Sequence, residues 1–463
     1  MGGSDLPSQA AEIIEECSPF RILVIGTTGV GKSTLINCTF KVEHANVSHL
    51  GAGKSNIDDE ITFLENPLFI LHDSQGLESG EVDNLNKIKD FVKRRMAEPK
   101  IKDRLHAVWL CIEVPRAGGR LFETGTEELL QLARDEQLPI VVVFTKFDML
   151  LLRERNRLRG KLPKEEIAPA AEKHAELFYE ERCEKPLAGL ARNTCCVKVS
   201  YNDYASLIHL VEVTSHLVLS HGEEDVFIVW AIAQRVSAGL KLKASVTVGM
   251  KRYWKGVSLK ETSCESGFQA CLDAIHTDMV SVWNFNDPVG LLSSTEITDM
   301  ILHLIEELGP TKRTTDPGDD LTTTNTTEPI AQAVLPVGGH VASAVCPSIT
   351  FVKWLLNTYD VTSDTLKCQM AYIVDLIAIL EQVLLLILAK PPQPIRLAEI
   401  QEAFSAYNGS SIRTNIHKGI RRYVEETDAV HHLDVGNTEK ETSRLVRQYC
   451  GASILTDLKL NRG

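Results

Sequence analysis

Eight consecutive residues near the N-terminus have the types and the spacing that phosphate binding requires. They fit the pattern G-x4-G-K-[ST] and are Gly26, Thr27, Thr28, Gly29, Val30, Gly31, Lys32 and Ser33. Glycines let backbone N–H groups turn toward phosphate oxygens, and a helix that begins here adds the positive end of its dipole. We expect Lys32 to reach the β and γ phosphates and Ser33 to bind Mg²⁺, with Thr34 beside them. The alternative is a glycine turn that only caps a helix.

A second short motif supplies groups for the metal ion and the γ-phosphate. Asp73, Ser74, Gln75 and Gly76 follow the apolar run LFILH and give the pattern D-x-x-G. We expect Asp73 to support Mg²⁺ and the N–H of Gly76 to hold the γ-phosphate, while Gln75 is a candidate for orienting water. The predicted catalytic residues are therefore Lys32, Gln75 and Gly76. The tetrapeptide alone is common. It indicates a nucleotide site here because it follows the phosphate-binding motif in the sequence.

A third motif selects the base of the nucleotide. Thr145, Lys146, Phe147 and Asp148 end the apolar run PIVVVF and match the pattern [NT]-K-x-D. The Asp148 carboxylate can accept hydrogen bonds from N1–H and from the exocyclic amine of guanine, and the Lys146 stem can lie on the ring face. Adenine lacks that pair of donors, so the motif indicates GTP and GDP. A solvated strand end is the alternative for the tetrapeptide alone.

Two serines are weaker candidates for the same site. A residue that closes over Mg²⁺ should precede the second strand, and Ser55 is better placed for this than Thr62, which falls inside the predicted strand. Ser200 follows the run CCVKV, where a backbone contact to the guanine carbonyl is expected. An ordinary loop serine and a simple strand end are the respective alternatives. The predicted metal ligands are thus Ser33, Ser55 and Asp73.

Alternating strands and helices would position these motifs. Short apolar runs predict strands at residues 21–26, 107–114, 139–146 and 195–200, and a hairpin at 61–64 and 68–74. Helices are expected at 33–40, 82–96, 126–136 and 206–219, with a charged insertion at 153–189. This alternation implies a mostly parallel sheet covered on both faces. The fold class is therefore α/β, and the nucleotide-binding domain spans residues 19–221.

The rest of the chain predicts helices rather than strands. Apolar residues recur at helical spacing in a predicted helical domain at 222–308. Residues 309–345 are rich in Thr, Asp, Gly and Pro, which indicates a flexible linker, and a helical C-terminal region follows at 346–463. The apolar run at 373–389 contains two acidic residues and is short for a membrane span, so we expect a buried helix.

Basic residues between positions 227 and 260 reverse the acidic balance of the chain. No acidic residue occurs there, and the seven basic residues are Arg235, Lys241, Lys243, Lys251, Arg252, Lys255 and Lys260. We expect an amphipathic helix that packs its apolar face on the nucleotide-binding domain and leaves its lysines in water. Peripheral membrane contact is the less favoured alternative. Similarly, His276 and Asp278 are expected to be a helix-surface pair rather than a metal site.

The overall composition is that of a soluble protein. Hydrophobic residues make up 44% of the 463 residues, enough for a core, and the net charge of -13 argues against binding nucleic acid chiefly through phosphate contacts. Eleven scattered cysteines indicate reduced thiols. The first residues lack the basic and apolar segments of a signal peptide. We therefore expect a cytoplasmic protein.

With these motifs assembled, residues 19–221 resemble the Ras-like (TRAFAC class) P-loop GTPases. HDSQGLESGE and RLHAVWLCIEVPRAGGRLFETG also look like stretches of uncharacterised fungal G-domain-containing proteins, and RYWKG and DMVSVWNFNDP extend that similarity to about residue 308. The resemblance implies a Ras-like G domain with GTP/GDP and Mg²⁺ as cofactors. It also implies a molecular switch that hydrolyses GTP to GDP and acts on an unknown protein effector.

One residue departs from this resemblance. Leu77 stands where Ras-like switches carry the Gln that orients the attacking water, so hydrolysis is expected to be slow without a partner or self-association. Related G domains commonly pair, and in such a homodimer Arg116 or Arg120 could act across the interface. An exposed basic loop is the alternative for these arginines. The rival function is a nucleotide-dependent scaffold with little or no turnover, and an ATP-dependent motor or kinase ranks last.

Overall fold

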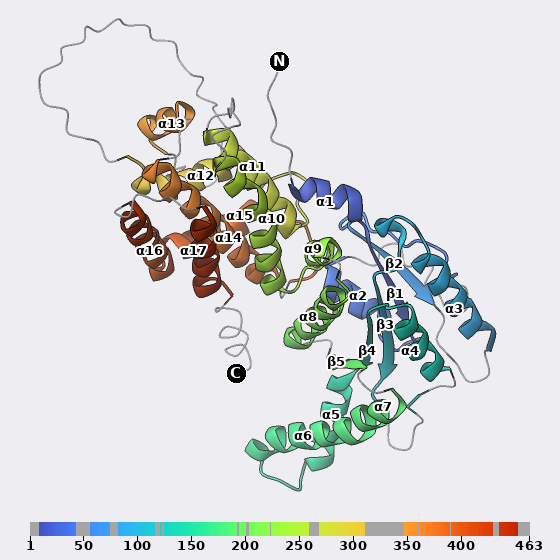
Figure 1. Cartoon of the computed structure of the whole chain (residues 1–463). Coiled ribbons are helices and arrows are strands. Elements are labelled where there is room, and N and C mark those ends of the chain that lie inside the picture. Colours follow the sequence, from blue (N-terminus) through green and yellow to red (C-terminus); the bar gives the residue numbers. More distant parts are fainter. Residues whose placement is uncertain are drawn as a thin grey trace, which may run out of the picture.

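The computed structural model shows a parallel β-sheet with helices on both faces, joined to a body of helices (Figure 1). The predicted α/β fold class, followed by helical regions, is therefore confirmed. The residues that the structure describes are 9–42, 56–74, 82–115, 121–122, 125–191, 194–200, 203–222, 224–258, 268–310, 347–358, 362–388, 390–428 and 435–451.

Five parallel strands form the sheet within the described residues, in the order β2-β1-β3-β4-β5. They are β1 (Phe20–Ile25), β2 (Phe69–Ser74), β3 (Ala107–Glu113), β4 (Ile140–Thr145) and β5 (Cys195–Lys198). Runs rich in Val, Ile and Phe suit strands that are buried on both faces. Because all strands are parallel, their carboxyl ends lie at one edge. The order reverses at β1, which is where ligands bind in sheets of this kind.

The predicted hairpin at 61–64 and 68–74 is wrong. Within the described residues, the first segment contributes only Ile61, in an isolated antiparallel bridge with Leu71. The following residues turn away from the sheet, because the Asn66 amide donates to the Ala233 carbonyl at 2.8 Å and to the Phe40 carbonyl at 3.3 Å. These tertiary hydrogen bonds replace the ladder that the alternating pattern suggested.

Helices cover the two faces of the sheet, and alternate residues of each strand point into two separate cores. One core packs α2 (Lys32–Phe40), α8 (Tyr204–Ser220) and α9 (Glu224–Ala233) on the first face. The other packs α3 (Val82–Met96) and α4 (Thr126–Asp135) on the second face. This two-sided burial is the arrangement that the alternation of strands and helices predicts.

The predicted insertion forms a helical hairpin beside the end of β4. It comprises α5 (Phe147–Leu158), α6 (Lys164–Tyr179), the π-helical turn η3 (Glu180–Glu184) and α7 (Lys185–Leu190). In Figure 1 these elements lie below the sheet. Tyr179 joins the hairpin to the core, since its ring makes edge-on contacts with Phe144 and Phe147. The residues that follow the TKFD motif are therefore fixed to β4 by aromatic packing.

The helical body is built on one hydrophobic cluster. Its helices are α10 (Ala238–Ser258), α11 (Phe268–Trp283), α12 (Thr295–Ile305), α13 (Ile349–Leu356), α14 (Ser363–Leu388), α15 (Leu397–Asn408), α16 (Ser411–Asp428) and α17 (Val435–Tyr449). Each contributes apolar side chains to that cluster. Helices before and after the predicted linker at 309–345 thus share a core, and the predicted domain boundaries stay predictions.

Helix α14 passes through the middle of this body and contacts α10, α11, α12, α15, α16 and α17. By length and composition it could cross a membrane, with a mean hydropathy of 2.3 in its most apolar window, yet 78% of that window is buried inside the protein. A core helix of a soluble protein passes the same test. The burial agrees with the buried helix expected at 373–389.

Two basic residues in the stretch at 227–260 are buried, although we expected this stretch to leave its charged side chains in water. Lys241 is fully buried, and its ammonium donates to the Ile232 carbonyl at 2.6 Å and to the Val282 carbonyl at 3.1 Å. Arg235 is only 5% exposed. Lys243 stays exposed, as expected. The expectation that the lysines lie in water failed at Lys241, because the turn of α10 places it against α11.

The predicted surface pair on α11 is also buried. The His276 ring donates from Nε2 to the Leu292 carbonyl at 2.7 Å, so Nδ1 accepts the hydroxyl hydrogen bond of Tyr372 at 3.0 Å. Burial lowers the pKa of His276, which agrees with this neutral ring. Asp278 accepts a hydrogen bond from the backbone of Ala10 at 3.4 Å. Among the described residues no group of three metal-ligating side chains occurs.

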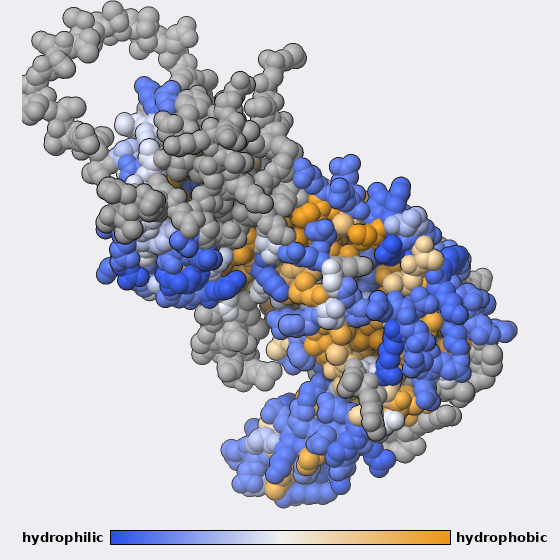
Figure 2. Space-filling view, viewed as in Figure 1, coloured by the Kyte–Doolittle hydropathy of each residue, from blue (hydrophilic) through white to orange (hydrophobic). Residues whose placement is uncertain are grey.

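The sheet domain and the helical body meet along a continuous junction. The first helix, α1 (Gln9–Cys17), packs against α9, α10 and α11. At the end of α2, the Lys41 ammonium donates to the Leu388 carbonyl at the end of α14, at 2.5 Å. Figure 2 shows hydrophilic residues over most of this face and hydrophobic residues in the middle of the molecule, where the two parts meet.

Candidate nucleotide-binding site

The loop between β1 and α2 has backbone geometry that glycine adopts without strain. Gly29 and Gly31 have φ angles of 77° and 108°, in the left-handed region. A Cβ atom on Gly26 would lie 2.7 Å from the carbonyl oxygen of Cys111 on β3. Gly26 therefore lets the loop lie directly against β3, and Gly31 lets the chain turn into the first residue of α2. The predicted phosphate-binding motif thus occupies a strand, loop and helix at the switch point of the sheet.

Lys32 is the first residue of α2, and its side chain folds back over the loop. Its Nζ donates to the Gly26 carbonyl at 2.5 Å and lies 3.6 Å from Oδ1 of Asp73. Ser33 is half-buried in the next position, and Thr34 is exposed. Lys32 of α2 and Asp73 of β2 thus bring the first and second motifs together.

Asp73 is buried at the carboxyl end of β2, and its Oδ1 has no hydrogen-bond partner in the described part of the chain. Burial raises the pKa of Asp73 to about 6, and the Lys32 ammonium opposes that rise. A buried carboxylate oxygen without a hydrogen bond is costly, and a cation relieves that cost. Carboxylate and hydroxyl oxygens are also the donors that Mg²⁺ prefers. Asp73 and Ser33 therefore fit the Mg²⁺ that the resemblance to Ras-like GTPases implies.

Thr145 connects the third motif to the phosphate-binding loop. Its hydroxyl donates to the Val30 carbonyl at 2.7 Å, and the side chain is buried. Since Thr145 ends β4 and Val30 precedes the start of α2, this single hydrogen bond spans the edge of the sheet. The phosphate motif and the base motif are therefore adjacent at this edge of the sheet.

Lys146 and Asp148 occupy the start of α5. Lys146 has a φ of 60°, and its ammonium donates to Oε2 of Glu113 at 2.7 Å. Asp148 lies in the first turn of α5, is half-buried, and makes no hydrogen bond or ion pair with another described residue. Its carboxylate thus remains available for a ligand, as recognition of guanine requires.

Ser200 is buried two residues beyond β5, next to the base motif. The backbone N–H of Phe147 donates to the Val199 carbonyl at 3.3 Å, which ties this turn to α5. The N–H of Ser200 donates to the Ser206 hydroxyl at 3.1 Å. The donor predicted to contact the guanine carbonyl therefore has an internal partner in this structure, and its contact with a base stays a prediction.

Several predicted residues lie outside the described residues. They are the metal candidate Ser55, the catalytic candidates Gln75 and Gly76, the departure at Leu77, and the proposed trans-acting residues Arg116 and Arg120. The structure therefore brings together Lys32, Asp73 and Thr145. The predicted roles of Gln75 and Gly76 stay predictions.

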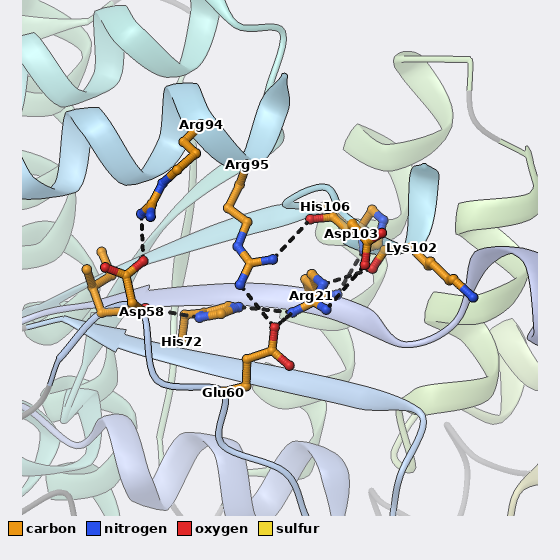
Figure 3. Close-up of polar contacts among 10 residues, drawn as sticks. Arg21, Asp58, Glu60, His72, Arg94, Arg95, Lys102, Asp103 and His106 are labelled. Carbon is orange, nitrogen blue, oxygen red and sulfur yellow. Dashed lines mark hydrogen bonds and ion pairs between the residues drawn. The ribbon is translucent and has the colours of Figure 1, made fainter. Parts of the chain in front are cut away.

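A network of ion pairs fixes the segment that leads into β2 (Figure 3). Glu60 accepts hydrogen bonds from Arg21 of β1 at 2.6 Å and from Arg95 of α3 at 3.0 Å. Arg94 donates to Asp58 at 2.6 Å. These residues anchor the chain that follows position 56 to both a strand and a helix. The network holds the described end of the segment that would close over the metal ion.

Sequence reasoning missed two elements of this arrangement. Glu113, the partner of Lys146, ends β3, and its position beside β4 follows only from strand order. The Arg21 network includes His106, whose Nδ1 accepts the backbone N–H of Arg21 at 2.8 Å. Burial lowers the pKa of His106 to about 4, so the ring is neutral near pH 7. Glu113 could have been predicted, because polar residues at the carboxyl ends of neighbouring parallel strands lie at the same edge of the sheet. No local sequence pattern marks His106.

Comparison with protein families assigns two parts of the chain. Residues 21–146 match a family described as 50S ribosome-binding GTPase, and residues 291–457 match a domain of unknown function, DUF8505. The first match contains the phosphate motif and the second motif, and it ends inside the third. The predicted P-loop GTPase domain is therefore confirmed, whereas the predicted closeness to fungal proteins stays a prediction.

One solved structure with similarity is described as a crystal structure of a probable GTP-binding protein engB. It is 16% identical, and the alignment covers 43% of this chain and 99% of that chain with a TM-score of 0.26.

Proposed function

Since the N-terminal part of the chain is a P-loop GTPase domain that binds guanine nucleotide, we propose that the protein hydrolyses GTP to GDP and phosphate with Mg²⁺ and acts as a molecular switch. The observation that carries this proposal is the hydrogen bond between Thr145 and Val30, which sets the base motif beside the phosphate motif. An adenine nucleotide would leave Asp148 without its donors.

The chain's own residues would bind and orient the reactants. Lys32 would neutralise charge on the β and γ phosphates, and N–H groups of the loop at 26–31 would hold their oxygens. Mg²⁺, held by Ser33 and Asp73, would supply further charge neutralisation. Water attacks the γ-phosphorus, the bond to the β–γ bridging oxygen breaks, and the proton of the water goes to the released phosphate.

A second candidate function is a nucleotide-dependent scaffold that scarcely turns over. Leu77 favours it, because leucine cannot orient water and so removes one contribution to hydrolysis. Self-association through the G domain could restore a missing group. In either case we propose a cytoplasmic protein with a protein effector. The matched family's description names ribosome binding, but the net charge of -13 of this chain opposes binding to RNA phosphates.

Phosphate release from GTP, measured over a wide range of protein concentrations, separates these functions. Turnover per molecule that rises with concentration would support a GTPase completed by self-association, and a constant turnover would mean that one chain contains the whole site. In both cases Lys32→Ala should abolish release, which controls for contaminating enzymes. GTP that stays bound without phosphate release would contradict hydrolysis and favour the scaffold.

A further inference from the structure

Lys146 of the base motif is paired with a residue that belongs to none of the three motifs. Its ammonium donates to Oε2 of Glu113 at 2.7 Å, and the two side chains are 34% and 35% exposed. A hydrogen bond between two charged groups is stronger than one between neutral groups. The chain itself therefore supplies a charged partner for this lysine.

The pairing of β3 with β4 fixes the position of both residues. Glu113 is the last residue of β3 and lies opposite Thr145 in the register of the two strands. The backbone N–H of Val114 then donates to the Thr145 carbonyl at 3.1 Å. Since Thr145 directly precedes Lys146, the sheet holds the backbone on both sides of the ion pair.

The backbone conformation of Lys146 is unusual for a residue with a Cβ atom. Its φ and ψ angles are 60° and 33°, in the left-handed region. Such a conformation is unfavourable for lysine, and strain of this kind is concentrated at ligand sites. The Lys146 carbonyl accepts from the N–H of Met149 at 3.0 Å and begins α5, while its side chain extends to Glu113 of β3.

A lysine that is free in solution loses conformational freedom when a ligand fixes it. The long stem of lysine has many rotamers, and restricting such a side chain weakens binding. The expected role of Lys146 is to lay this stem on the face of the guanine ring. A partner that already holds the ammonium reduces the loss of freedom, because the stem is fixed at both of its ends.

We propose that Glu113 is a positioning residue for the nucleotide base, which holds the Lys146 ammonium so that the lysine stem lies along the ring. The inference rests on the proposed binding of guanine nucleotide at this site. In this arrangement Glu113 acts through Lys146 and does not itself contact the base. It therefore strengthens the binding of any purine that fills the site, whereas Asp148 selects guanine.

The test is equilibrium binding of GDP, in the presence of Mg²⁺, to the full chain and to Glu113→Gln, Lys146→Met and the double variant. Glutamine keeps the size of Glu113 without its charge, and methionine keeps an unbranched stem without the ammonium. Each single variant should weaken GDP binding by roughly 3- to 10-fold, the cost of ordering one long side chain. The double variant should lose no more than either single variant, since both remove the same contact.

Inosine diphosphate distinguishes this role from that of Asp148. It has the ring and the N1–H of GDP but lacks the exocyclic amine that Asp148 is expected to bind. Glu113→Gln should weaken the binding of both nucleotides by the same factor, so the ratio of their affinities should stay at the wild-type value. A changed ratio would mean that Glu113 acts on the hydrogen-bonding edge of the base, which would overturn the proposed role.

Glu172→Gln is the matched control, because Glu172 forms an exposed ion pair with Arg155 of α5. It removes the same charge and should bind GDP as the wild type does. If Glu113→Gln does not fold, Glu113→Asp, whose carboxylate is drawn back by one methylene, takes its place in the same cycle.

The proposal is overturned if the Glu113 variant binds GDP as tightly as the wild type, or if the losses of the two single variants add up in the double variant. The proposed hydrolysis is judged separately. A chain that shows the expected Glu113 effect on GDP but releases no phosphate from GTP would support the role of Glu113 and contradict only the hydrolysis.

Discussion

The sheet domain and the helical body each contain a buried aspartate, and the two aspartates are paired differently. At the edge of the sheet, one carboxylate oxygen of Asp73 makes no hydrogen bond to any described residue and lies beside Lys32. In the helical body, Asp375 of α14 is paired on both oxygens: it accepts from the Tyr407 hydroxyl at 2.6 Å and lies 2.8 Å from Nε2 of His417. Asp73 can therefore still accept a bond from a ligand. Asp375 instead uses both carboxylate oxygens to link α14 to α15 and α16.

Two buried histidines, one from each part of the molecule, differ in charge. His106 of the sheet domain is neutral, because burial lowers its pKa to about 4. His417 of the helical body lies between Asp375 and Glu307, with Nδ1 2.7 Å from the Glu307 carboxylate. Burial opposes its positive charge, but these two carboxylates raise its pKa overall. Acid should therefore weaken the sheet domain through His106, while alkali should weaken the helical body through His417.

The largest expected effect is the loss of Asp375. Asp375→Ala leaves His417 and Tyr407 buried without their acceptor, and removing one partner of a buried pair costs about 3–5 kcal/mol. Urea unfolding should show that loss in the free energy of unfolding. Asp364→Ala is the control on the same helix, because Asp364 is partly exposed in an ion pair with Lys367, and it should cost less than about 1 kcal/mol. Equal costs would contradict the structural role of Asp375.

The next effect is on pH dependence in the sheet domain. The folded pKa of His106 is about 4, below the usual 6.5, so its contribution is complete above pH 6.5 and is lost as the pH falls toward 4. The loss should reach roughly 3 kcal/mol, because each pKa unit corresponds to about 1.4 kcal/mol. The charged groups that lower this pKa are Arg21 and Arg104.

Urea unfolding between pH 7 and pH 4 measures this loss, and His106→Gln should flatten the profile over that range. For His417 the sign is reversed: its contribution is complete below pH 6.5 and is lost as the pH rises through the raised folded pKa. A histidine NMR titration in which His106 becomes protonated near pH 6.5 would contradict the assignment.

A smaller effect is expected from the base motif. Asp148→Asn replaces an acceptor oxygen by an amide donor, which suits the C2 carbonyl of xanthine rather than the amine of guanine. Preference should therefore shift from GDP toward XDP by roughly 10- to 100-fold, the value of one or two hydrogen bonds. Competition binding of GDP and XDP measures the shift. A loss of both nucleotides alike would mean that Asp148 supports folding rather than base recognition.

The smallest effect should come from the surface. Lys89 of α3 pairs with Glu128 of α4, and both side chains are partly exposed. Lys89→Ala should change the free energy of unfolding by less than about 1 kcal/mol, because exposed ion pairs contribute little. If Lys89→Ala lowered the free energy of unfolding as much as Asp375→Ala, exposed and buried ion pairs would contribute equally, which would contradict this account.

The sequence predicted the parts of the molecule that depend on local rules. Gly31 must be glycine because of its positive φ, and apolar runs between helices must form buried parallel strands. These rules placed Lys32, Asp73 and Thr145 at one edge of the sheet. Polar side chains that are paired by distant elements gave no such signal, as with Lys41, whose acceptor Leu388 is 347 residues away.

The failed predictions have the same cause. Lys241 and His276 lie on helices where spacing alone allows either solvent or a neighbouring helix, and only the packing of α10, α11 and α14 decides between them. The hairpin at 61–64 failed because Asn66 bonds to α9 and to the end of α2. Tertiary contacts, and not local propensity, therefore determine the burial of Lys241 and His276 and the path of the segment at 61–64.

Equilibrium binding of GDP and ADP to the purified chain in the presence of Mg²⁺ tests the central claim most directly. The claim is that the phosphate motif at 26–33, Asp73 and the motif at 145–148 form one site for a guanine nucleotide. We predict that GDP binds at least roughly 100-fold more tightly than ADP, since adenine leaves the Asp148 carboxylate without its two donors. Equal binding of ADP and GDP would contradict the claim.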